Sequence, residues 1–154
     1  MELGNVLAIV GAALAVMLTG IGSAIGMSWV QQAAAGVVSE EPEKYGKTLI
    51  LQLIPSSNAL YGFVVGFLIV SQILFAGMSY TVMEGLAIIG FCLPIAVVGL
   101  FSCLGQAKVC VSGITMVGKK AELSGRALTM AVFIELFALF ALIISVLGVL
   151  QIGA

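Results

Sequence analysis

Long stretches without charged side chains dominate this sequence, and they limit what the chain can fold into. Residues 3–39, 48–83 and 85–107 contain no Asp, Glu, Lys or Arg, and residues 127–154 contain only Glu135. A helix that crosses the hydrocarbon core of a bilayer needs about 20 predominantly apolar residues, so each stretch can hold one span. Only 8% of all residues are charged, against roughly 25% in a typical soluble domain. We therefore predict an all-α membrane protein with four transmembrane helices.

Charges and turn residues set the expected limits of the helices. We expect connections near 39–47, 79–85 and 118–125. Glu84 suits the N-terminus of the third helix, because a carboxylate stabilises the positive end of a helix dipole. The first apolar stretch lacks the basic segment of a signal peptide and is too long for one, so we expect it to remain as a span. The predicted helices are roughly 5–37, 48–77, 84–116 and 124–152.

The basic residues predict the orientation in the membrane. All six lie in or near the first and third connections, and none lies near the termini or the second connection. Positively charged loops stay in the cytoplasm, so we expect a multi-pass protein of the cell membrane with both hairpin loops cytoplasmic and both termini outside. The six are Lys44, Lys47, Lys108, Lys119, Lys120 and Arg126.

Composition argues against several classes of function. A net charge of -1 gives no electrostatic case for nucleic acid. The chain has no His, which removes the commonest metal ligand and the usual neutral-pH base. The spacings of Cys92, Cys103 and Cys110 fit no zinc or disulfide framework, and we expect these side chains to pack as small apolar groups. With no nucleophile–base pair or phosphate loop in the sequence, we expect a non-catalytic protein.

The second half of the sequence repeats the first at a constant offset, which carries Leu7 onto Leu86. The match runs through both predicted hairpins, so we predict two tandem helical hairpins at 1–78 and 79–154, related as a parallel repeat. Further matched pairs are Gly20 with Gly99, Ser23 with Ser102, Gly26 with Gly105, Glu43 with Glu122 and Gly46 with Gly125.

Small side chains recur at spacings of three and four in segments 20–26 and 99–105. In lipid, such spacings let helix backbones approach closely, because packing drives association there. Two interpretations stay open at this point. The small residues can pack helices within one monomer, or they can crowd the inner helices of a ring of many subunits.

Glu135 lies near the middle of the fourth predicted span. It follows Arg126 by nine residues, which is roughly 13 Å of helical rise within a hydrocarbon core about 30 Å thick. An ionised carboxylate at that depth is costly, so an intramembrane acid indicates function. The alternatives are a structural, hydrogen-bonded acid and a site for a cation, either a proton or a metal ion.

Depth also identifies polar residues that could join Glu135. The midpoint between Gln106 and Glu135 falls inside the third connection, so in an antiparallel hairpin these residues lie level. A lone Gln in a membrane helix can also act simply as an interhelical hydrogen-bonding group. The repeat offset carries the same depth to Ser56 on the second helix.

Proline next to Ser56 is expected to open the second helix. Pro55 cannot donate a backbone hydrogen bond and clashes with a carbonyl one turn earlier, so carbonyls are freed to face a site. Ser57 and Asn58 add a hydroxyl and an amide oxygen, and Tyr61 lies one turn after Ser57. Oxygen ligands of this kind suit a hard cation, and the single carboxylate balances a monovalent charge.

These motifs resemble the proteolipid family of V-type ATPases, whose members build the rotor ring and are named K or c, in its bacterial form. The resemblance spans nearly the whole chain. It rests on residues 20–26, 42–46, 51–55, 60–63, 93–95 and 99–106 and on Glu135.

The resemblance implies a ring of many copies, turned by a soluble ATP-hydrolysing motor and facing a stator membrane subunit, central-stalk subunits and lipid. In sodium-pumping members the ion is held at positions that correspond to Glu135, Gln106, Ser57, Asn58 and the Ile54 carbonyl, and a tyrosine that corresponds to Tyr61 hydrogen-bonds the carboxylate. Those members have Thr and Gln where this chain has Ser57 and Asn58. Both replacements keep the oxygen, so we favour Na+ as the ion, with H+ as the alternative.

Our prediction is a rotor-ring subunit of a rotary V-type ATPase. Two other hypotheses fit four spans and one buried acid. The first is a small proton-coupled secondary transporter, which would work as a dimer around a substrate cavity, and the second is a structural pore-forming proteolipid.

Overall fold

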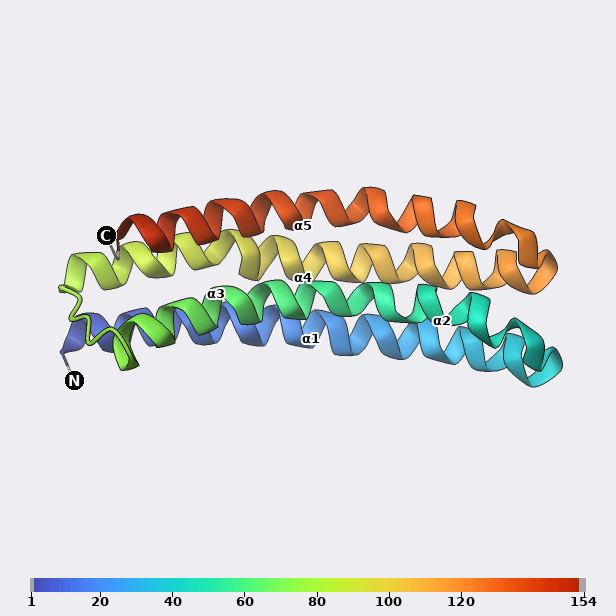
Figure 1. Ribbon diagram of the computed structural model, residues 1–154, viewed down its shortest axis with the longest axis horizontal. Helices are drawn as coiled ribbons and strands as arrows, with labels where there is room; N and C mark the ends of the chain where they lie inside the picture. Colours follow the sequence, from blue (N-terminus) through green and yellow to red (C-terminus); the bar gives the residue numbers. More distant parts are fainter. Residues whose placement is uncertain (1, 153–154) are drawn as a thin grey trace.

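A computed structural model describes residues 2–152, and all of the regular secondary structure in that range is helical (Figure 1). This confirms the prediction of an all-α fold. All four long helical segments are long and apolar enough to cross a membrane. The α-helices are α1 (Leu3–Glu40), α2 (Tyr45–Leu53), α3 (Ser57–Leu74), α4 (Val82–Lys119) and α5 (Ser124–Ile152). The 3-10 helices are η1 (Pro42–Lys44), η2 (Ile54–Ser56) and η3 (Ala121–Leu123).

Helix limits differ from the predicted ones by a few residues. The first and third helices are longer than predicted at both ends, because helical hydrogen bonding continues past the last apolar residue. The second helix ends at Leu74, short of the predicted limit near 77. The expected role of Glu84 is confirmed: its backbone N–H donates to Thr81 Oγ1 at 3.3 Å, and its carboxylate accepts from the Thr81 N–H at 2.7 Å. This capping box begins α4.

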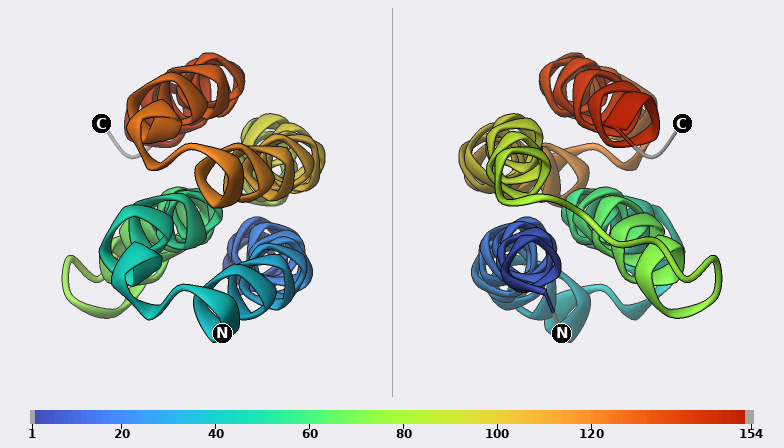
Figure 2. Two further views of the ribbon diagram at one scale, coloured as in Figure 1. Left: turned by 90° about the vertical axis from the view of Figure 1, so that its right-hand side faces the viewer. Right: turned by 90° about the vertical axis from the view of Figure 1, so that its left-hand side faces the viewer.

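The helices form two layers, with α1 beside α4 and α2–α3 beside α5 (Figure 2). Glycines bring α1 and α4 close together. A Cβ atom built on Gly26 would lie 2.9 Å from Cβ of Ala107, and one on Gly22 would lie 3.0 Å from Cδ1 of Leu100. Gly22 and Gly26 therefore allow close packing within the chain. A Cβ atom built on Gly20 would meet no atom of a neighbouring element within 4 Å.

The helical elements of the second half begin where the repeat in the sequence places them. The first and last residues of Val82–Lys119 are the repeat equivalents of those of Leu3–Glu40, and η3 is the equivalent of η1. Helix α5 begins at the equivalent of the first residue of α2, but it continues without interruption where the first half of the chain has η2. The two halves thus share one architecture, and they differ in the continuity of their second helix.

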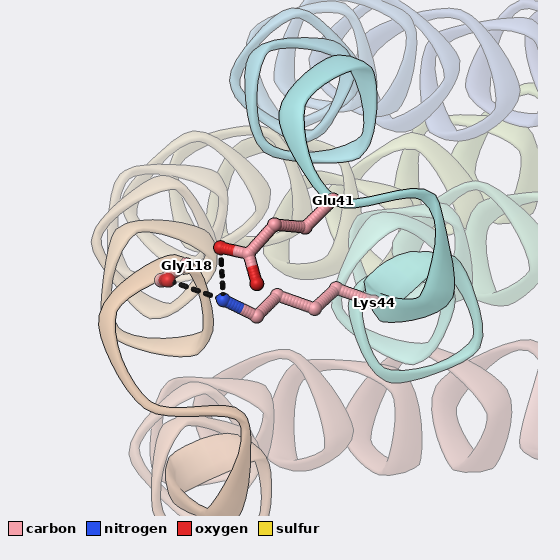
Figure 3. Close-up of polar contacts among 3 residues, drawn as sticks. All are labelled: Glu41, Lys44 and Gly118. Atoms are coloured by element: carbon pink, nitrogen blue, oxygen red, sulfur yellow. Dashed lines mark hydrogen bonds and ion pairs between the residues drawn. The ribbon is translucent and has the colours of Figure 1, made fainter.

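One lysine joins the two hairpins at the end of the bundle that holds the first and third connections (Figure 3). Lys44 Nζ pairs with Glu41 Oε1 at 2.5 Å and donates to the carbonyl of Gly118 at 2.6 Å. Gly118 lies in the last turn of α4, whose final carbonyls carry partial negative charge, and a cation there is favourable. The first connection is therefore attached to the second hairpin by a polar contact.

Candidate ion-binding site

Glu135 lies on α5 and is almost completely buried, with 9% of its surface exposed. Both carboxylate oxygens accept hydrogen bonds from other helices. The Tyr61 hydroxyl of α3 donates to Oε1 at 2.5 Å, and Gln106 Nε2 of α4 donates to Oε2 at 2.5 Å. Three helices therefore meet at one carboxylate, and hydrogen bonding offsets part of the cost of burying it.

Gln106 is the centre of a polar chain that crosses the bundle. Its side chain is fully buried. Besides the bond to Glu135, its Nε2 donates to the Ala131 carbonyl at 3.3 Å, and its Oε1 accepts from Asn58 Nδ2 at 3.3 Å. The structure thus brings together Asn58, Gln106 and Glu135, which the sequence had placed at one depth.

Asn58 leaves one oxygen without a partner. Its side chain is fully buried, its Nδ2 is used by Gln106, and its Oδ1 has no hydrogen-bond donor within reach. A buried acceptor without a donor is costly. An amide oxygen that is free, buried and joined to a carboxylate through one glutamine fits a ligand of a hard cation.

Ser57 and Ile54 lie at the break in the second helix, which the structure places at η2. The Ser57 hydroxyl donates to the Ile54 carbonyl at 2.9 Å. The two oxygens predicted as ion ligands therefore lie next to each other. Pro55 is buried within η2. The expected opening of the helix at this proline is what separates α2 from α3.

Two residues that the sequence did not single out for the site complete the break. The Ala59 N–H, one turn after Pro55, donates to Ser23 Oγ at 3.1 Å, and the Pro55 carbonyl accepts from Cys103 Sγ at 3.1 Å. Side chains of α1 and α4 therefore satisfy backbone groups that a continuous helix would pair with each other. The repeat pairs Ser23 with Ser102, but no pattern in the sequence marked Cys103 as more than a small apolar residue.

An open groove of about 490 Å³ on the outer side of the bundle leads to the carboxylate. Glu135, Tyr61, Ser57 and Ile54 all line it, whereas Asn58 and Gln106 lie behind them, fully buried. The rest of its lining is mostly aliphatic. Those residues are Ile50, Leu53, Ser56, Leu60 and Val132.

The predicted ligands consist of one carboxylate, that of Glu135, and several neutral oxygens. Over residues 2–152, no three His, Cys, Asp or Glu side chains gather closely enough to hold a metal ion. A cation at Glu135 would therefore be coordinated mainly by amide, hydroxyl and carbonyl oxygens, as hard monovalent ions can be.

Comparison with known proteins identifies the family of the chain. The family model for the ATP synthase C subunit matches the chain twice, over residues 10–69 and 89–147. The chain belongs to the ATP synthase C-subunit family. The two matches fall on the two hairpins, one in each half of the chain.

Two curated relatives of this C-subunit family member are informative. The chain is 42% identical to the V-type sodium ATPase subunit K of Enterococcus hirae, over 96% of this chain and 93% of the relative. It is 34% identical to the A-type ATP synthase subunit K of Methanocaldococcus jannaschii, over 92% of this chain and 61% of the relative. Both relatives are named as K subunits, one of an ATPase and the other of an ATP synthase.

Proposed function

We propose that this chain is the rotor-ring subunit of a V-type rotary ATPase and carries Na+ on Glu135. One observation carries the proposal: a buried carboxylate is bonded through both oxygens to Tyr61 and Gln106, and Gln106 in turn joins it to Asn58, whose Oδ1 has no partner. The naming of the Enterococcus hirae relative as a sodium ATPase subunit supports the choice of ion. Proton carriage alone is the alternative, and it would use only the carboxylate.

The proposed ligands are Glu135, the amide oxygens of Gln106 and Asn58, the Ser57 hydroxyl and the Ile54 carbonyl, and Tyr61 holds the carboxylate. Bound Na+ neutralises Glu135, so the site can pass through lipid without a bare charge. Where water reaches the site at a stator subunit, the ion can leave, and rotation alternates the two states. Pro55 contributes by interrupting the helix, which allows the Ile54 carbonyl and the Ser57 hydroxyl to share the groove with Glu135.

The proposed partners follow from the family. Further copies form the ring, a stator membrane subunit faces Glu135, the central-stalk subunits bind the ring, and lipid covers the rest. This chain carries no catalytic group in the proposal, and ATP is hydrolysed elsewhere in the complex. The two repeats are 1–78 and 79–154, and their outermost residues, 1, 153 and 154, lie outside the described range.

The orientation that we propose places both hairpin loops in the cytoplasm and both termini outside. Its support is that all six basic residues lie in or near those loops. Single cysteines at Glu41 and Ala121 should react with an impermeant maleimide only from the cytoplasmic side. Labelling of either position only from outside would reverse the orientation.

The ion is tested by protection of Glu135 from a hydrophobic carbodiimide, which attacks protonated carboxyls reached from lipid. We expect wild-type protein to be labelled at Glu135, Na+ to prevent labelling, and K+ to act only at much higher concentration. Lowering the pH should weaken protection, because protons and Na+ compete for one carboxylate. Glu135→Gln is the control that must remove labelling. If Na+ does not slow labelling at any pH, the site carries protons and not Na+.

A further inference from the structure

The break in the second helix is held in place by side chains from two other helices. In a continuous helix the Pro55 carbonyl would accept from the Ala59 N–H, four residues later. Here the carbonyl accepts from Cys103 Sγ of α4 at 3.1 Å, and the Ala59 N–H donates to Ser23 Oγ of α1 at 3.1 Å. Cys103 Sγ and Ser23 Oγ are themselves 3.6 Å apart. The two side chains therefore form one polar contact with the turn that contains Pro55.

The turn at Pro55 carries most of the proposed ion ligands. Ile54 precedes the proline, and Ser57 and Asn58 follow it closely. Residues three apart in a 3-10 helix lie on the same side, and Ile54 and Ser57 accordingly both line the groove that leads to Glu135. Pro55 and Asn58 are buried and do not line it. A rotation of this turn would therefore move the oxygen ligands relative to the carboxylate.

Contact with this turn distinguishes Cys103 from the other two cysteines. All three side chains are fully buried. Cys92 and Cys110 lie about 16 Å and 10 Å from Cys103 along α4, so neither reaches the turn. A thiol is a weak hydrogen-bond donor, but a backbone carbonyl without a donor is costly in the hydrocarbon region. Cys103 supplies the Pro55 carbonyl with a donor in place of the backbone N–H that is diverted to α1.

We propose that Cys103 is a positioning residue of the ion site, whose thiol holds the turn at Pro55 in the rotation that presents its oxygen ligands to an ion on Glu135. This inference rests on the proposed sodium function. Ser23 contributes from the other side of the break. Cys103 itself does not bind the ion, because it is buried outside the groove. Without the thiol the turn can rotate, so the affinity for Na+ falls while the carboxylate keeps its own hydrogen bonds.

The alternative is that Cys103 only fills space, as a small apolar side chain does. Two substitutions separate these roles. Cys103→Ser keeps a hydrogen-bond donor and removes the bulk of the sulfur, whereas Cys103→Ala removes both. Packing alone predicts that both variants weaken Na+ binding alike, and positioning predicts that only the alanine variant does. Cys92→Ala and Cys110→Ala make the same change at equally buried positions and serve as matched controls.

The variants are compared in the assembled complex by the Na+ concentration that halves carbodiimide labelling of Glu135. For Cys103→Ala we expect this concentration to rise about threefold, because a buried carbonyl loses a weak donor. Cys103→Ser should stay close to the wild-type value, since a hydroxyl can also donate, and both controls should match wild type. Without Na+, all variants should be labelled at the same rate, because none of the changed side chains is bonded to the carboxylate.

Ser23→Ala removes the acceptor of the Ala59 N–H and should also raise the Na+ concentration for half protection. It decides the question if Cys103→Ala does not assemble, and an unchanged value would then overturn the inference. An unchanged value in Cys103→Ala would overturn it too, and so would equal shifts in Cys103→Ala and Cys103→Ser. Each of these results leaves the proposed function standing. Wild-type protein that Na+ never protects would instead overturn the proposed sodium function, and this inference with it.

Discussion

The two hairpins share their helix limits and differ in chemistry. At equivalent positions the first hairpin has Ser56 and Met27 where the second has Glu135 and Gln106. The second helix of the first hairpin is broken at Pro55, whereas Ile134 lies in an uninterrupted α5. One hairpin thus supplies an opened backbone with neutral donors, and the other supplies the charge. The residues of the proposed site come together only where the two halves meet.

This division has a physical reason. When the acid lies on an uninterrupted helix, all backbone groups of that helix stay hydrogen-bonded. This matters in the hydrocarbon region, where an unpaired backbone group is costly. The break at η2 exposes carbonyl and amide groups, and these need partners such as Ser23 and Cys103. After duplication the halves could diverge, so that one half carries the buried carboxylate and the other carries the helix break.

The largest difference should come from removing the charge. Glu135→Gln keeps the size of the side chain and removes the only carboxylate of the site, so we expect ion transport and carbodiimide labelling to be lost completely while the assembly keeps its native mass. Ser56→Ala, at the equivalent position of the first hairpin, should leave both near the wild-type level. Normal pumping by Glu135→Gln would contradict the assignment of the site.

The next effect concerns the glutamine between the halves. Gln106→Leu leaves Glu135 Oε2 and Asn58 Nδ2 without their present partners, and a buried unsatisfied group costs about 1–3 kcal/mol. We expect about a tenfold or larger rise in the Na+ concentration that halves carbodiimide labelling. Met27→Leu is the control from the first hairpin. A Gln106→Leu protein with wild-type Na+ protection would show that the amide is structural only.

A smaller effect is expected from the phenol. Tyr61→Phe removes the donor to Glu135 Oε1, and the net value of one hydrogen bond is about 1 kcal/mol. The Na+ concentration for half protection should therefore rise about fivefold. Tyr45→Phe, which changes an exposed tyrosine, should have no such effect. Equal shifts in both variants would show that Tyr61 does not hold the carboxylate.

The smallest effect belongs to the polar link at the loop end. Lys44→Met removes the contacts with Glu41 and Gly118, and we expect a loss of about 0.5 kcal/mol in the free energy of unfolding, measured by thermal denaturation in detergent. Lys47→Met, which removes no ion pair or hydrogen bond seen in the described structure, is the control. An unchanged melting temperature for Lys44→Met would show that this contact does not stabilise the join between hairpins.

The sequence by itself determined the number of spans, their approximate limits, the repeat and the depth of the polar residues. These features depend on composition and on spacing along the chain, because each residue of a helix advances by about 1.5 Å whatever its neighbours are. Gln106 and Glu135 could therefore be placed at one level, and the break at Pro55 could be expected from the chemistry of one residue.

Only the tertiary structure decided how the helices are rotated toward one another. It directs the Tyr61 hydroxyl to Glu135, joins Asn58 to Gln106, and turns the Ser57 hydroxyl toward the Ile54 carbonyl. It also assigns Cys103 to the Pro55 carbonyl, which spacing could not indicate. Spacing along a helix gives depth and relative angle on that helix alone. The angle between separate helices is set by which small residues allow close approach, and that depends on the packing of the whole bundle.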